Sequence, residues 1–162
     1  MSLVHTINEH PLNLRTLYEI LLNDKKLQLS SIATTRIEKC RTFLDQKING
    51  ISSPVYGINT GFGALHNVKI RGEDLHKLQE NLVMSHACGT GEEAPKIIVK
   101  LMILLKIQSL SYGYSGVQRM IVVRLLDFYN NDILPIVYEQ GCLLYTSPSP
   151  RDISGSRMPS SA

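Results

Sequence analysis

The chain has 162 residues, 43% of them hydrophobic, and carries a formal net charge of +3. This length suits a single domain with its own core, and the apolar fraction excludes a wholly disordered chain. The 17 Lys and Arg residues only slightly outnumber the 14 Asp and Glu residues, and they are spread along the chain. The sequence therefore gives no reason to expect a nucleic-acid partner or an anionic membrane surface.

The chain also lacks the signals of export, membrane insertion and metal binding. Its start, MSLVHTINEHPLNL, has no charged region followed by a long apolar stretch, so it does not resemble a secretory signal. The most apolar segment, 97–107, is interrupted by Lys100 and is far shorter than the ~20 residues of a membrane span, which predicts a buried helix. Cys40, Cys88 and Cys142 lack metal-type spacing, so we expect reduced thiols, no metal and a cytoplasmic protein.

Two helices are predicted in the first fifty residues. The first begins near Pro11, and apolar residues recur on one of its faces: Leu14, Leu17, Tyr18, Leu21 and Leu22. Ser30 and Ser31 are suitable caps for the second helix, and Asn49-Gly50 suits its end because both residues tolerate left-handed backbone. The apolar positions of the second helix are Ile32, Ile37, Cys40, Leu44 and Ile48.

Residues 52–70, SSPVYGINTGFGALHNVKI, are predicted to form an irregular loop, and a loop of this length usually has a function. Helical periodicity resumes near Gly72 and continues to about Cys88, with Leu75, Leu78, Leu82 and Val83 in one stripe.

Two further helices are predicted after residue 93. Ala94-Pro95 begins a helix that is apolar on nearly every side, a pattern typical of a helix in the middle of a bundle. A tight connection at 113–116 leads into the next helix, which ends at Asn130-Asn131. Its residues expected to face inward are Val117, Ile121, Leu125 and Phe128.

Three short patterns have an unremarkable interpretation when each is taken alone. Gly89 to Ala94 matches a dinucleotide-binding pattern, but a helix precedes it and two glutamates would repel phosphates, so we interpret it as a helix–helix turn. His86 and Cys88 are two residues apart, so on one helix they point to different faces. Taken alone, Cys88 is interpreted as a small core residue. His86 is interpreted as a structural histidine and Tyr56 as an ordinary loop residue.

The sequence changes character after Gly141. Residues 142–162 are rich in Ser and Pro and have no hydrophobic periodicity, which is typical of an unstructured segment. We interpret 1–141 as the protein proper. We interpret 142–162 as unstructured, non-native read-through into sequencing-adapter DNA.

Taken together, four segments resemble the amino-terminal part of the histidine and aromatic amino-acid ammonia-lyases. They are VYGINTGFG at 55–63, LQENLVMSHACGTGE at 78–92, YGYSGV at 112–117 and NNDILPIVYEQG at 130–141. The resemblance covers essentially all of 1–141. It implies a mainly α fold, the amino-terminal domain of the ammonia-lyase (fumarase/aspartase-like) helical fold, with minor strand pieces and a Gly-rich active-site loop.

The resemblance also implies roles for individual residues. Tyr56 matches the family's catalytic tyrosine, which removes a β-proton, and it needs a lowered pKa to act as a base near neutral pH. The matching active-site loop consists of Gly57, Asn59, Thr60, Gly61, Phe62 and Gly63. Its glycines would let the backbone close tightly over a small ligand.

Ser85 and His86 match the positions that contact the substrate side chain. Tyrosine-selective relatives tend to show His-Leu there and phenylalanine-selective ones Phe-Leu, whereas Ser-His is typical of histidine-selective members. A polar pocket can pair with the donor and the acceptor of an imidazole, which favours L-histidine as substrate and urocanate as product.

The family's electrophile is methylidene-imidazolone, which forms from an internal Ala-Ser-Gly that this sequence does not contain. We therefore expect no diffusible cofactor, a homotetrameric parent enzyme and an inactive fragment. Two alternatives remain open: a tyrosine or phenylalanine ammonia-lyase or aminomutase of the same fold, and a non-catalytic helical interaction module.

Overall fold

The computed structural model describes residues 3–50, 60 and 74–141, apart from the side chains of a few residues within them. Contacts divide the chain into two compact units. Unit 1 comprises Met1–Ile51 and Ala94–Ile136, and unit 2 comprises Ser52–Glu93 and Val137–Ala162.

Unit 1 begins with a parallel strand pair that flanks a short helix. Strand β1 (Val4–Ile7) pairs with strand β2 (Lys26–Leu29), and helix α1 (Leu14–Leu22) lies between them in sequence. Asn13 caps α1, since its side-chain oxygen accepts from the Thr16 N–H at 2.8 Å. Such a parallel pair needs a crossover connection, and α1 supplies it.

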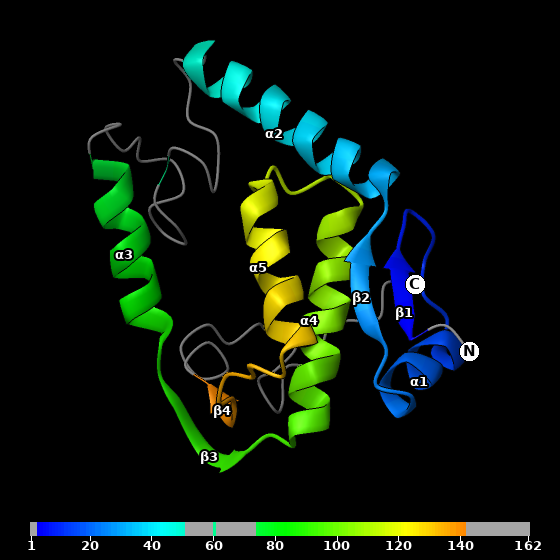
Figure 1. Cartoon of the computed structure of the whole chain (residues 1–162). Helices are drawn as coiled ribbons and strands as arrows, with labels where there is room; N and C mark the ends of the chain where they lie inside the picture. The colour runs from blue at the N-terminus through cyan, green and yellow to red at the C-terminus, as the bar shows by residue number, and fades with distance from the viewer. Residues whose placement is uncertain (1–2, 51–59, 61–73, 142–162) are drawn as a thin grey trace, which may run out of the picture. The chain divides into compact units, whose positions relative to one another are not determined.

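Three longer helices complete unit 1 (Figure 1). Helix α2 (Ser31–Gly50) is capped by the Ser30 hydroxyl, which accepts from the Ala33 N–H at 3.1 Å. Helices α4 (Lys96–Ser111) and α5 (Arg119–Asn130) pack side by side, and α2 crosses them at the end where they are joined.

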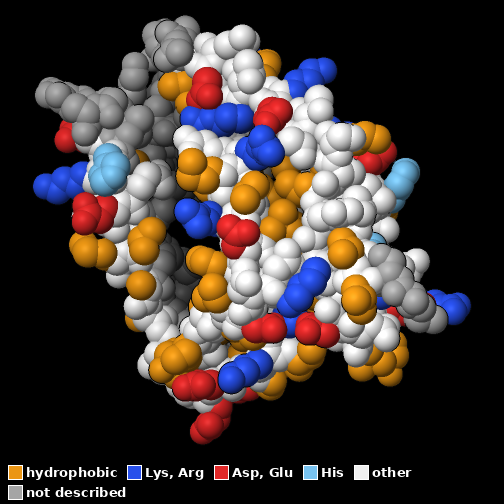
Figure 2. Space-filling model, in the orientation of Figure 1, with side chains coloured by type: hydrophobic (Ala, Val, Ile, Leu, Met, Phe, Trp, Pro, Cys, Tyr) orange, Lys and Arg blue, Asp and Glu red, His pale blue; other side chains and the backbone are white. Residues whose placement is uncertain are grey.

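The core of unit 1 lies where these elements meet. Its fully buried apolar side chains come from every element: Ile7, Ile20, Leu27, Ala33, Ile37, Val99, Leu104, Ile107, Val122 and Tyr129. Many other large apolar side chains reach the surface, where Figure 2 shows them among charged ones.

Unit 2 contains helix α3 (Leu75–His86) and a strand pair. Strand β3 (Gly89–Glu93) is antiparallel to strand β4 (Tyr138–Gly141), with an irregularity between Thr90 and Glu93. Every residue of both strands is exposed. None of the described helices in either unit is long and apolar enough to cross a membrane.

The mainly α prediction is confirmed, but several local predictions are wrong. Gly89–Glu93 is a strand and not a helix–helix turn, because its backbone pairs with β4 some fifty residues later. Strands β1, β2 and β4 were not located from the sequence, since each consists of four residues that pair only with a distant segment.

The buried faces of three helices also differ from those predicted. In α1 the buried residue is Ile20, while Leu14 is 85% exposed. In α5 the buried positions are one residue later than expected, so that Val122 is buried and Ile121 is 50% exposed. Helix α4 buries one face only, and its opposite face carries three exposed apolar side chains, Ile98, Met102 and Leu105.

Candidate functional site

The predicted active-site loop falls mostly outside the residues that the structure describes. Tyr56, Gly57, Asn59, Gly61, Phe62 and Gly63 all lie there. Thr60 is described, and its side chain is buried at 1% exposure. The predicted roles of the remaining loop residues therefore stay predictions.

The predicted substrate-selecting pair ends a helix. Ser85 and His86 are the last two residues of α3, and their side chains lie outside the description. The Ala87 N–H makes the last helical bond, to the Val83 carbonyl at 2.9 Å, and β3 begins two residues later. Cys88 is exposed in this connection, so its prediction as a core residue is wrong.

Both parts of the predicted site fall in one unit. Unit 2 includes the whole stretch Ser52–Glu93, to which the loop and the Ser85–His86 pair belong. Across the described part of the chain, no group of three or more His, Cys, Asp or Glu side chains could hold a metal ion.

Unit 1 contains a charged cluster that was not predicted from the sequence. The Lys100 ammonium lies 2.6 Å from an Asp24 carboxylate oxygen and 2.5 Å from one of Asp132, and the lysine side chain is only 12% exposed. It also lies 5.0 Å from the centre of the Tyr129 ring. This lysine therefore joins the segments that follow α1 and α5.

The two aspartates occupy equivalent positions at helix ends. Asp24 and Asp132 have φ values of +44° and +54°, so both are in the left-handed region. The Lys25 N–H bonds to the Ile20 carbonyl, and the Ile133 N–H bonds to the Phe128 carbonyl, which completes a Schellman motif at each helix end. An Asn-Asp pair marks both ends in the sequence and could have predicted these turns.

The electrostatics of the cluster indicate a structural role. The hydrogen bond and charge of Lys100 lower the pKa of Asp24. Burial lowers the pKa of Lys100, but its bonds to Asp132 and Asp24 outweigh burial and leave that pKa raised. Burial also raises the pKa of Tyr129. A lysine held protonated between two carboxylates is neither a base nor a nucleophile, so the cluster stabilises unit 1.

Comparison with known proteins shows which family this chain resembles. The family model described as aromatic amino acid lyase matches residues 12–144. The histidine ammonia-lyase of Deinococcus radiodurans is 43% identical over 135 residues, which are 83% of this chain and 26% of that protein.

Solved structures show the same fold. The structure of histidine ammonia-lyase from Trypanosoma cruzi has a TM-score of 0.74 and 28% identity, covering 87% of this chain and 27% of that one. A tyrosine aminomutase from Streptomyces globisporus, at a TM-score of 0.78 and 22% identity, covers 86% of this chain and 26% of its own, and it shows the fold alone. The chain thus spans about a quarter of the length of these relatives, and it belongs to the aromatic amino acid lyase family.

Proposed function

We propose that this chain is the amino-terminal part of a histidine ammonia-lyase, which eliminates ammonia from L-histidine to give urocanate. The observation that carries the proposal is the 43% identity to the Deinococcus radiodurans histidine ammonia-lyase over 135 residues. The Ser85-His86 sequence at the end of α3 supports it, because a polar pair suits an imidazole better than a phenyl ring.

In the proposed reaction the substrate loses a β-proton, its α C–N bond breaks and ammonia leaves. Tyr56 would take the β-proton, which requires a lower pKa than the ~10 of an ordinary tyrosine. His86 and Ser85 would bind the imidazole of the substrate. The glycines at 57, 61 and 63 would allow the loop that carries Tyr56 to exclude water from the reacting atoms.

The electrophile of the proposed enzyme does not fit the residues present. Methylidene-imidazolone needs an Ala-Ser-Gly triplet, and the 162 residues contain none: Gly141 is followed by Cys-Leu-Leu. We therefore propose that a protein of this sequence is inactive by itself. The active parent enzyme would be a cytoplasmic homotetramer.

The first test is to sequence the source DNA across the codon of Gly141. The proposal expects an Ala-Ser-Gly codon run shortly downstream, and the enzyme encoded by that longer reading frame should convert L-histidine to urocanate, followed by ultraviolet absorbance. Genuine DNA for 142–162 would instead favour the non-catalytic helical interaction module. Formation of cinnamate or coumarate without urocanate would favour a phenylalanine or tyrosine lyase.

Two variants of the longer enzyme test the residue roles. Replacing Tyr56 by Phe should lower kcat by about 10² to 10⁴, the usual contribution of a general base. Replacing His86 by Phe should raise KM for histidine and improve the relative rate with phenylalanine. Near-normal turnover of the Tyr56 variant would mean that this tyrosine has a structural role and is not the base.

A further inference from the structure

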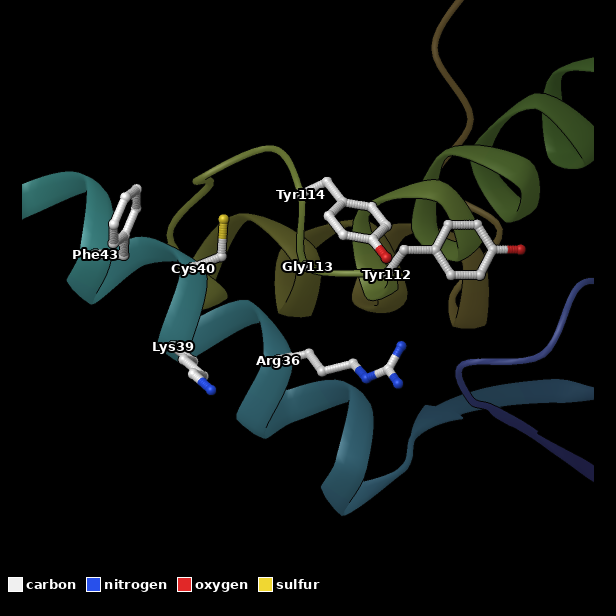
Figure 3. A pocket seen from close by; sticks show the side chains of 7 residues that line it. All are labelled: Arg36, Lys39, Cys40, Phe43, Tyr112, Gly113 and Tyr114. Atoms are coloured by element: carbon white, nitrogen blue, oxygen red, sulfur yellow. The ribbon is translucent and has the colours of Figure 1, made fainter.

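Unit 1 contains a hollow between α2 and the connection from α4 to α5 (Figure 3). Its volume is about 350 Å³, within the range of sites for small organic ligands. The lining residues are Arg36, Lys39, Cys40, Phe43, Tyr112, Gly113 and Tyr114. They comprise two cations, three aromatic rings and a thiol, and no carboxylate.

The wall of this hollow is fixed by a close backbone contact. Gly113 has φ +74°, and a Cβ at this position would lie 2.7 Å from the Arg36 carbonyl oxygen. Only glycine permits this conformation and this approach together. Nearby, Arg41 donates to the Gly116 carbonyl at 3.3 Å, which ties the connection to α2 at a second point. The connection between α4 and α5 is thereby held against α2.

The charge of the hollow is not neutralised within the described part of the chain. Neither Arg36 nor Lys39 has an ion pair or side-chain hydrogen bond to a described residue. The neighbouring acids of α2 are engaged elsewhere: Glu38 pairs with Arg119 at 3.3 Å, and Asp45 pairs with Arg41 at 2.5 Å. The two cations are therefore available to an anion from outside.

Two of the three aromatic rings, those of Tyr112 and Tyr114, lie on the same side of the hollow as the Arg36 guanidinium, whereas Phe43 lies at its other end. Figure 3 shows the Arg36 side chain extending from α2 in the direction of Tyr112 and Tyr114, whereas Lys39 points away from them. Tyr114 is 87% exposed and Phe43 is 61% exposed, so both rings are accessible to a ligand from outside.

We propose that this hollow binds a small planar aromatic carboxylate. The planar guanidinium of Arg36 matches a carboxylate through two parallel N–H···O bonds. The rings of Tyr112 and Tyr114 supply stacking or edge contacts to an aromatic ligand held by Arg36. Lys39 adds positive charge at longer range, and the volume accommodates one ring with its carboxylate. This inference is independent of the proposed lyase activity, because every lining residue belongs to unit 1.

Protection of Cys40 tests the proposal on the whole 162-residue chain. The half-buried Cys40 lines the hollow, whereas the exposed Cys88 belongs to unit 2 and serves as the internal control. The rate of alkylation of each thiol by iodoacetamide is followed by mass spectrometry with benzoate as the probe. Saturating benzoate should slow alkylation of Cys40 several-fold and leave that of Cys88 unchanged.

Matched ligands and variants sharpen this test. Acetate lacks the ring and benzyl alcohol lacks the charge, so both should protect Cys40 much less than benzoate does. Arg36→Gln should weaken benzoate binding about tenfold, in keeping with the loss of a charged hydrogen-bond pair. Lys39→Gln should weaken it about two- to threefold. Arg124→Gln, a change at another exposed arginine of unit 1, should have no effect.

Either of two results would overturn the proposal. One is equal slowing of Cys40 and Cys88, or slowing of neither. The other is unchanged benzoate protection in Arg36→Gln, with circular dichroism showing that the variant is folded.

Discussion

The described parts of the two units of this chain differ in how many apolar side chains they bury. Unit 1 has a core to which all six of its helices and strands contribute, together with a lysine cluster that joins two helix ends. In unit 2, Thr60 is the one buried residue among the side chains that the structure describes, and both strands are fully exposed. Yet the predicted catalytic and substrate-selecting residues all fall in unit 2.

This contrast separates the residues that form a scaffold from those that carry the proposed chemistry. Burial of apolar surface is the main source of folding free energy. Among the described residues, the buried apolar side chains belong to unit 1. Elements with few buried contacts open locally at low free-energy cost. We therefore expect substitutions in unit 1 to change global stability and equivalent substitutions in unit 2 to change it little.

The largest difference is expected for apolar truncations. Leu104→Ala removes a fully buried side chain of α4 and should lower the free energy of unfolding by about 3 to 4 kcal/mol. Val83→Ala, on an α3 residue that is 66% exposed, should lower it by less than about 0.5 kcal/mol. Urea unfolding followed by circular dichroism measures both. Equal losses would mean that α3 is packed as tightly as α4.

A second comparison uses two glycines with positive φ. Gly113→Ala combines backbone strain with a clash against the Arg36 carbonyl, and should destabilise unit 1 by about 2 to 3 kcal/mol. Gly91→Ala in β3 has similar strain, at φ +87°, but its Cβ would meet only the flexible Gln140 side chain at 3.4 Å. Gly91→Ala should lower the stability of the β3–β4 pair by about 1 kcal/mol. Hydrogen exchange should become faster in that pair alone. Exchange that spreads into α4 would contradict the separation into units.

The lysine cluster gives an intermediate effect. Lys100→Met leaves two carboxylates together without their shared cation, and should cost about 1 to 2 kcal/mol, reduced from the value of a buried pair because both aspartates are more than half exposed. Lys106→Met, at an exposed position on the same helix, is the matched control and should be neutral. If Lys100→Met leaves the free energy of unfolding unchanged in the same urea experiment, the cluster does not stabilise unit 1.

The smallest expected effect is the dependence of unit 1 on pH. The folded-state pKa of Asp24 is lowered by Lys100, so its contribution to stability is present above the ordinary carboxylate pKa of about 4 and is lost as the pH falls through the lowered value. Burial and the nearby Lys25 charge lower the pKa of His5, so its contribution is lost as the pH falls below about 6.5. Unit 1 should therefore become less stable on acidification in two steps. Lys100→Met should abolish the lower step only, as measured by thermal unfolding across pH.

Helix positions were predicted well from the sequence because helical signals are local. Ser30 caps α2, Pro95 precedes α4, and Asn130-Asn131 ends α5, all as predicted. Each signal depends on bonds within one or two turns of the chain. Strands β1 to β4 could not be located in this way, because their pairing partners lie about twenty to fifty residues away.

The inward faces were harder to predict, for a different physical reason. Helix α5 has apolar residues on two overlapping stripes, one through Ile121 and Phe128 and the other through Val122 and Tyr129. Periodicity alone cannot choose between them, since both repeat at helical spacing. The choice depends on which neighbours the helix meets, here including β2 and α4. Likewise, Lys100 appears in the sequence only as an interruption of an apolar segment, because both of its partners are far away in the chain.

The Asn130 side chain affects whether strand β2 can pair with a strand of another molecule. Its carboxamide oxygen accepts from the Leu27 N–H at 2.8 Å, and its NH₂ group donates to the Leu27 carbonyl at 2.9 Å. Both backbone groups of Leu27 that point away from β1 are thus occupied by an amide from α5, much as a third strand would occupy them. An exposed strand edge is a template for joining the sheet of another molecule. Asn130 therefore prevents Leu27, on this edge of β2, from pairing with a strand of another molecule.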